Sequence, residues 1–156
     1  MHFSEVRRTA LVNIPVNEQT ILDLIDRAYD TDTTIRKTLY NSILPKISPR
    51  DLSMPHREFI VRKGLGDRES SVRTAAASLI VIWMHALQPK VEVEVDDDHA
   101  TTSKVEDEVV SILKLFDLTQ AVAVDALLSI FTTNVEVFND IEFNGELVTC
   151  IFLLIT

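Results

Sequence analysis

Arginine and aspartate recur in a fixed frame along this sequence of 156 residues. Asp30 stands six residues before Arg36, and Asp67 stands six residues before Arg73. A guanidinium group can bind a carboxylate through two parallel hydrogen bonds, and it can bind a phosphate in the same way. The frame is therefore compatible with two chemistries, namely ion pairs within the protein or contacts with a phosphate-bearing ligand.

The same frame belongs to an internal repeat. The repeated dipeptides are Val6-Arg7, Ile35-Arg36 and Val72-Arg73, which follow one another at intervals of 29 and 37 residues. A period of roughly 20 to 50 residues is typical of solenoids, and helical repeats of the HEAT type lie near its upper end. The sequence therefore predicts stacked helical hairpins that carry an arginine at an equivalent position of each repeat.

We interpret the repeated charges mainly as structural. An aspartate just before a helix can accept hydrogen bonds from the free amides of the first turn. An arginine in that helix can pair with an acid of the adjacent repeat, so that a ladder of ion pairs runs along the stack. The residues assigned to caps and ladder are Asp30, Asp32, Arg36, Asp67 and Arg73, with Arg7 as a further rung. Phosphate binding by the arginines is the alternative.

A second set of basic residues is the candidate for DNA contact. Arg8 and Lys37 each follow a ladder arginine directly, so they lie one step round the helix and are freer to face outward. Other basic residues surround the connection at residues 45–65. Several helices of a solenoid could present such residues as a stripe that holds a nucleic-acid backbone without reading bases. The candidates are Arg8, Lys37, Arg57, Arg62 and Lys63, and ordinary solvated surface charge is the alternative explanation.

The sequence indicates neither a catalytic nor a metal site. The four histidines lie on different predicted elements, and Cys150 has no basic neighbour in sequence that would activate its thiol. His99 follows an acidic run at residues 96–98, which we interpret as a solvated loop rather than as a cation site. A glycine-rich phosphate loop, paired metal ligands and a nucleophile elbow are not found in the sequence. We therefore predict a protein that is not an enzyme and uses no cofactor or metal.

The composition favours an all-α chain. Hydrophobic residues make up 46% of the sequence, but there are only three glycines and 6% aromatic residues, whereas a β-sandwich needs many turns. The longest apolar run, Leu147–Ile155, is shorter than the about 20 residues that span a membrane. The single cysteine and the lack of a signal sequence predict a nuclear or cytosolic protein without a membrane partner.

Charge is distributed unevenly along the chain. Residues 1–90 hold thirteen Lys and Arg against ten Asp and Glu, a net charge of +3. Residues 91–156 hold two against fourteen, a net charge of −12, and the two parts sum to the total of −9. The acidic total therefore does not exclude a DNA-binding surface in the first part.

Apolar residues recur with helical spacing in successive segments. Helices are expected at about residues 4–12, 17–30, 32–44, 54–63, 67–87, 104–116, 119–131 and 135–141. Trp83, Leu22 and Leu128 are among the residues assigned to buried faces. Gly64 is expected to adopt the left-handed conformation just after the helix at residues 54–63.

The chain divides into four predicted segments. HEAT-like repeats are expected at residues 1–88 and again at 104–144, with an acidic disordered insert at 89–103 between them. The alternation of valine and glutamate at residues 91–95 also fits a strand, which is left as an alternative. Residues 145–156 form an atypical, truncated end, because a terminal repeat needs a polar outer face. We therefore expect the chain to be a fragment of a longer protein.

Two runs of the sequence carry a resemblance to a known family. They are VRRTALVNIPVNEQTILDLIDRAYDTDTTIRKTLYNSILPKI and REFIVRKGLGDRESSVRTAAASLIVIW, and LKLFDLTQAVAVDALLSIF and FNDIEF extend them. In this order the motifs resemble the HEAT-repeat subunit of condensin, the condensin subunit 3 or chromosome-associated protein G family. The resemblance runs from Val6 to about Phe143, and members of that family are several times longer. It does not extend beyond Gly145.

The resemblance implies a function. The family's subunit is a curved, non-catalytic scaffold that binds the kleisin subunit and, together with it, double-stranded DNA during mitotic chromosome condensation. ATP hydrolysis belongs to the SMC ATPase subunits, which are indirect partners, and the expected location is the nucleus and chromosome, with the cytoplasm in part of the cell cycle. A HEAT-like adaptor that binds only protein, in transport or signalling, is the alternative. The basic stripe distinguishes the two hypotheses.

Overall fold

The computed structural model describes residues 3–87, 111, 114–117 and 119–133. Within these ranges every regular element is a helix, as the sequence predicts. The predicted insert at residues 89–103, the predicted helix at 135–141 and the segment at 145–156 lie outside the described residues, as does most of the predicted helix at 104–116.

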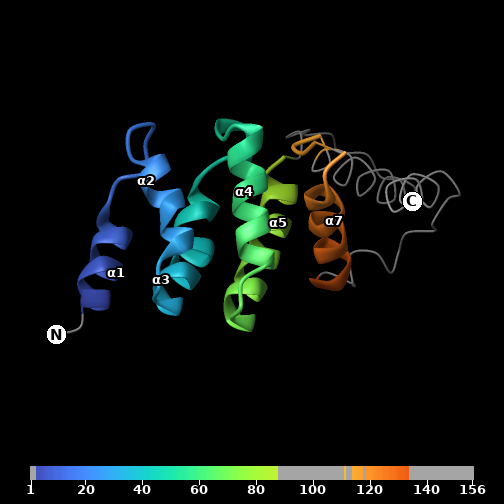
Figure 1. The fold of residues 1–156 in the computed structure, drawn as a ribbon. Helices are drawn as coiled ribbons and strands as arrows, with labels where there is room; N and C mark the ends of the chain where they lie inside the picture. Colours follow the sequence, from blue (N-terminus) through green and yellow to red (C-terminus); the bar gives the residue numbers. More distant parts are fainter. Residues whose placement is uncertain (1–2, 88–110, 112–113, 118, 134–156) are drawn as a thin grey trace, which may run out of the picture.

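The elements keep the labels of Figure 1. The longer helices are α1 (Phe3–Asn13), α4 (Met54–Leu65), α5 (Ser70–Ala86) and α7 (Ala121–Thr133). The shorter α-helices are α2 (Ile21–Ile25) and α3 (Thr33–Thr38). Four irregular turns complete the set, namely the 3₁₀ turns η1 (Asp26–Tyr29), η3 (Leu44–Lys46) and η4 (Pro49–Asp51) and the π-helical turn η2 (Leu39–Ile43).

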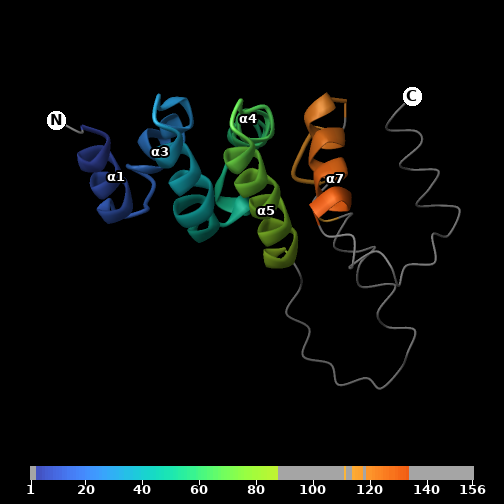
Figure 2. The ribbon, with the colours of Figure 1, turned by 90° about the horizontal axis from the view of Figure 1, so that it is seen from below.

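The helices stack in two rows. α1, α3, α5 and α7 lie side by side in one row, in which each packs against the next (Figure 2). The second row contains α2 with η1, followed by α4, which contacts η1 as well as α5. Each second-row element thus pairs with the first-row helix that follows it in the chain. This is the predicted α-solenoid of helical hairpins.

Side chains at the turns explain where several helices begin. The Asn17 carboxamide oxygen accepts hydrogen bonds from the amides of Gln19 and Thr20, which shapes the turn before α2. The Asp32 carboxylate accepts from the Thr34 amide at 2.7 Å and so caps α3. Proline also stands in the first turn of α4, where a missing amide hydrogen costs nothing.

One continuous core runs between the two rows. Its largest fully buried side chains include Trp83 and Tyr40, and the Tyr40 hydroxyl donates to the Ile60 carbonyl at 2.9 Å. Two predicted core residues are instead exposed, Leu22 by 51% and Leu128 by 47%. At about 100° per residue, Leu128 falls on the side of α7 opposite to its buried residues, and Leu22 lies on the flank of the α2 stripe.

Gly64 does not have the predicted conformation. It lies inside α4, and none of the glycines among the described residues has a positive φ. A Cβ atom added to Gly64 would collide with the Cβ of Ala76 and would lie 2.7 Å from the Tyr40 ring. Glycine is therefore required here because α4 approaches α5 and η2 closely, and not because the backbone is left-handed.

We expect Gly64→Ala to destabilise the fold although alanine is the better helix former. The gain in helix propensity is about 1 kcal/mol, whereas overpacking a tight contact costs about 1 to 3 kcal/mol. Urea unfolding should therefore show a lower midpoint. Adding Ala76→Gly should recover part of the loss, and a lone Gly64→Ala variant as stable as the wild type would contradict the packing explanation.

Candidate functional site

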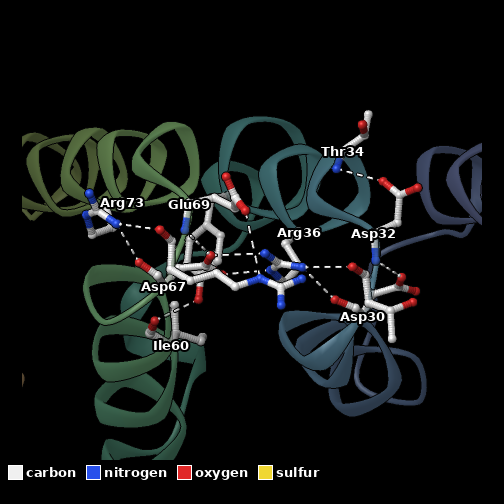
Figure 3. Close-up of polar contacts among 11 residues, drawn as sticks. Asp30, Asp32, Thr34, Arg36, Ile60, Asp67, Glu69 and Arg73 are labelled. Atoms are coloured by element: carbon white, nitrogen blue, oxygen red, sulfur yellow. Dashed lines mark hydrogen bonds and ion pairs between the residues drawn. The ribbon is translucent and has the colours of Figure 1, made fainter.

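The best-buried ion pair in the described residues joins Arg36 and Asp67. Arg36 Nε donates to Asp67 Oδ2 at 2.7 Å, and Nη2 donates to Oδ1 at 3.0 Å. Only 6% of the Arg36 side chain and 8% of the Asp67 side chain are exposed. The third nitrogen, Nη1, donates to the carbonyls of Asp30 and Thr31 at 2.8 and 3.3 Å (Figure 3). One guanidinium group thus joins the turns of two consecutive hairpins.

Arg7 and Asp30 form the corresponding pair one repeat earlier. Arg7 Nε and Nη2 donate to the two carboxylate oxygens of Asp30 at 2.9 and 3.0 Å. The Arg7 side chain is 37% exposed, so this rung is closer to solvent than the pair of Arg36 and Asp67. The two rungs lie on the same edge of the stack, where the turns inside the hairpins are.

Asp30 and Asp67 have a different local role from the predicted helix caps. The Asp67 carboxylate accepts from the Glu69 amide at 2.9 Å, and the Asp30 carboxylate accepts from the Asp32 amide at 2.9 Å. Each bond closes a tight turn just before the helix and does not reach the amides of the first helical turn. Among these aspartates, the helix is capped by Asp32, one residue before α3 begins.

Arg73 repeats only half of the Arg36 arrangement. Its Nη1 donates to the carbonyls of Asp67 and Arg68 at 2.8 and 3.0 Å, as Arg36 Nη1 does one repeat earlier. Within the part of the chain that the structure describes, however, Arg73 has no carboxylate partner. The ladder therefore has two closed rungs, followed by an arginine whose Nε and Nη2 are not bound by an acid of these residues.

Asp117 is a frame residue that the sequence reasoning missed. Its carboxylate accepts from the Thr119 amide at 3.0 Å, which is the same turn that Asp30 and Asp67 make. Its own amide donates to Glu58 at 3.1 Å, so it is tied to α4. The signal was present in the sequence, because Asp117 stands five residues before Val122 just as Asp67 stands five before Val72. The arginine of the frame is replaced by Ala123.

The ion pairs shift the pKa of the acids in the ladder. The hydrogen bonds from Arg36 hold the pKa of Asp67 below its usual range, although burial opposes this effect. Burial is also the largest influence on Asp30 and raises its pKa, but the bonds from Arg7 and from the Asp32 amide together outweigh burial and lower it. Both carboxyl groups therefore bind protons more weakly in the folded protein than in the unfolded chain.

The DNA candidates occupy unlike environments. Arg8 and Lys37 are exposed on α1 and α3, at equivalent positions of two helices that pack side by side. Arg8 makes only a 3.4 Å contact with the exposed Glu5. Arg62, near the end of α4, is also exposed and lines a cleft with Arg73 and Thr74. Thr74 occupies on α5 the position that Arg8 and Lys37 occupy on their helices.

Lys63 is exposed but faces a different neighbour. Its Nζ atom lies 4.4 Å from the centre of the Tyr29 ring, at a distance typical of a cation–π contact. The ring also packs against Phe59. Lys63 thus covers the junction between η1 and α4, and it is not among the residues that line the cleft of Arg62 and Arg73.

Arg57 does not fit the predicted stripe. Its guanidinium donates to the carbonyls of Pro49, Leu52 and Leu115 at 2.8 to 2.9 Å. Burial lowers the pKa of this group. Arg57 therefore joins η4 and the start of α4 to the segment before α7, and its donors point at backbone oxygens instead of at solvent.

Other kinds of site were sought in the same residues. No group of three or more His, Cys, Asp or Glu side chains is arranged to hold a metal ion within the described ranges. No described helix is both long and apolar enough to cross a membrane.

Comparison with known proteins relates the chain to one family. No protein-family model matches it. It is 45% identical over 78 residues to condensin complex subunit 3 of Schizosaccharomyces pombe, and the aligned segment covers 49% of this chain and 9% of that protein. It is 28% identical over 145 residues to condensin complex subunit 3 of Saccharomyces cerevisiae, and this alignment covers 90% of this chain and 12% of that protein.

A solved structure matches in three dimensions as well. The crystal structure of the S. pombe condensin Cnd3-Cnd2 subcomplex matches with a TM-score of 0.74 and 31% sequence identity. The match covers 92% of this chain and 17% of that chain. The chain is a relative of condensin complex subunit 3. It spans only about a tenth of the length of the curated condensin relatives.

We expect Asp67→Asn to destabilise the condensin-like stack strongly. Removing one partner leaves the Arg36 charge buried without its carboxylate, which typically costs about 3 kcal/mol. Chemical unfolding measures this loss. Glu5→Gln is the matched control because it removes an acid from the exposed pair with Arg8, and it should change stability little. Equal effects of the two substitutions would show that burial of the pair is unimportant.

The free energy of unfolding should also decrease as the pH is lowered. Because the pKa values of Asp30 and Asp67 are lowered by folding, their contribution is fully present above the unfolded pKa of about 4 and is lost as the pH falls below it. Thermal melts should therefore show that the contribution of these two carboxylates to stability is nearly constant between pH 7 and 5 and declines below pH 4. Asp67→Asn should make that decline shallower, and an unchanged slope would contradict the assignment.

Proposed function

We propose that the chain is part of a non-catalytic scaffold of condensin, which binds the kleisin subunit and duplex DNA during mitotic chromosome condensation. The relationship to condensin complex subunit 3 supports the assignment to condensin. The similar Cnd3 structure was solved as a subcomplex with Cnd2, which supports a kleisin partner. In this proposal the SMC ATPase subunits are reached indirectly, and the protein acts on the chromosome in the nucleus.

The observation that carries the DNA part of the proposal is the register of Arg8 and Lys37. Both stand one residue after a ladder arginine, and the closed rungs of Arg7 and Arg36 fix how their helices are rotated. The two outward charges therefore belong to one side of the first row of helices. At the next step the position is Thr74, but Arg62 of α4 borders the same cleft as Thr74 and supplies a cation there.

These cations are available to a phosphate backbone. Lys37 has no ion-pair partner among the residues that the structure describes. The exposed contact between Arg8 and Glu5 is of a kind that contributes 0 to about 1 kcal/mol, so phosphate can replace it at little cost. Non-specific DNA binding needs this kind of solvent-facing charge and gains affinity by releasing counterions.

The protein-only adaptor is the second candidate function. It is favoured by two of the predicted DNA residues, because Arg57 is bound by backbone carbonyls and Lys63 lies over Tyr29. A stripe reduced to Arg8, Lys37 and Arg62 is short for DNA binding by this segment alone.

We further propose the same division of the chain that the sequence predicts. Residues 89–103 separate two blocks of repeats, at residues 1–88 and 104–144.

We expect the triple variant Arg8→Glu, Lys37→Glu, Arg62→Glu to lose DNA binding while it keeps its fold and its kleisin partner. The full chain should be tested in a pull-down with a kleisin subunit, and by salt titration of its binding to a duplex. Removing three phosphate contacts should lower the dependence of log K on log salt by about 3 units.

The matched control carries the same change in charge elsewhere. Arg27→Glu, Arg68→Glu and Lys114→Glu reverse three exposed cations that do not belong to the proposed stripe. This control should bind duplex DNA with a nearly unchanged salt slope. Equal losses in both triple variants would mean that only net charge matters, and kleisin capture without any DNA binding by the wild type would favour the adaptor.

A further inference from the structure

A cleft between α4, α5 and α7 shares Arg62 with the DNA stripe, but its other features are explained neither by that stripe nor by the ladder. Its volume is about 620 Å³, and its charged walls are Arg62 of α4, Arg73 of α5 and Asp125 of α7. Figure 1 shows these three helices next to one another, and α7 packs against both α4 and α5. The cleft lies one repeat beyond the pair of Arg36 and Asp67.

Arg73 lines this cleft with one side of its guanidinium group restrained. The carbonyls of Asp67 and Arg68 bind its Nη1 atom and so restrain the guanidinium plane. On Arg36 the same restraint is accompanied by a carboxylate on Nε and Nη2, at 2.7 and 3.0 Å. On Arg73 this second edge has no acid among the described residues, and a two-oxygen anion fits it by the geometry of the preceding rung.

Ser129 provides an independent indication of a ligand. It lines the same cleft from α7, it is only 8% exposed, and its hydroxyl has no hydrogen-bond partner among the residues that the structure describes. A buried hydroxyl without a partner is unfavourable, and helical serines usually bind the carbonyl four residues earlier. Ser129 thus brings an unpaired hydroxyl group to the wall of the cleft that Arg73 also lines, although the hydroxyl oxygen itself is covered from solvent.

The remaining walls decide which anion fits. Two arginines and one aspartate leave a net charge of +1, which matches a singly charged carboxylate or phosphodiester better than a phosphomonoester that carries two charges. Leu128, which is 47% exposed, lines the cleft together with Leu65 and Ala77. A duplex backbone has no aliphatic group to cover such a wall, whereas a peptide has both kinds of side chain.

We propose that this cleft binds an acidic peptide segment of a protein partner. A glutamate or aspartate carboxylate of the peptide binds the free edge of Arg73 and accepts from the Ser129 hydroxyl, and a neighbouring aliphatic side chain packs on Leu128. The peptide acid thereby takes the place that Asp67 has on Arg36. This inference goes beyond the proposed function, since neither Arg73, Ser129 nor Leu128 belongs to the DNA stripe.

The test titrates the full chain with the peptide acetyl-LEELEL-amide, and with acetyl-LQQLQL-amide as the uncharged counterpart. We expect the acidic peptide to bind at least about tenfold more tightly, which is the scale of one charge-assisted hydrogen bond. Arg73→Gln and Leu128→Glu should each weaken that binding by about tenfold or more. Ser129→Ala should weaken it less and should leave thermal stability equal or higher, because it removes the unpaired donor.

Ile82→Glu is the control for Leu128→Glu, because Ile82 is similarly exposed at 42% but does not line the cleft. It should leave peptide binding unchanged. Equal binding of the two peptides, or binding that is insensitive to Arg73→Gln in a variant with a normal melting curve, would overturn the proposal. Binding of inorganic phosphate or of a short duplex that depends on Arg73 and excludes the acidic peptide would also overturn it, by identifying a phosphate site.

Discussion

The buried ion pair of Arg36 and Asp67 is the contact on which the arrangement of the stack depends. Burying two charges is costly unless every donor and acceptor is satisfied, and here the guanidinium reaches one carboxylate and two carbonyls. The same carboxylate also closes the turn before α5 by accepting from Glu69. A single pair therefore sets the distance between two hairpins, the rotation of α3 and the entry into α5.

The regularity of that contact has a consequence for the outer surface. Once Arg7 and Arg36 are fixed toward the next acidic turn, the residues that follow them must face solvent on the same side of their helices. Arg8 and Lys37 become a row without any contact between them. A binding surface on a stack of repeats can thus arise from the register of the helices, and the weak individual contacts of its side chains leave them free for a ligand.

The departures from regularity are equally informative. At the third repeat Thr74 replaces the outward cation, and at the fourth Ala123 replaces the frame arginine, so both the ladder and the row change character near α7. In the same region Arg57 is drawn inward by three carbonyls, and Ser129 is buried without a partner. The repeat formed by α4 and α5 therefore differs from its predecessor where it meets α7, and this is where the structure opens a cleft.

Much of the fold follows from the sequence alone. The spacing of apolar residues predicts the helices, because the helical period is a local property, and the aspartate and arginine frame predicts repeats that are linked by charge. The family resemblance also came from local motifs in a fixed order. These features require no knowledge of which segments meet.

Only the tertiary structure decided the roles that depend on contact between distant segments. The sequence predicts that Gly64 ends a helix, yet glycine is needed there because Ala76 and Tyr40 leave no room for a side chain. Arg57 reads as surface charge, yet its donors meet a carbonyl 58 residues away at Leu115. Arg36 and Arg73 occupy the same position of the sequence frame. Their environments differ because Asp67 binds Arg36, whereas no acid among the described residues binds Arg73. The period of the sequence determines the direction in which a side chain leaves its own helix, whereas tertiary packing determines which groups it contacts.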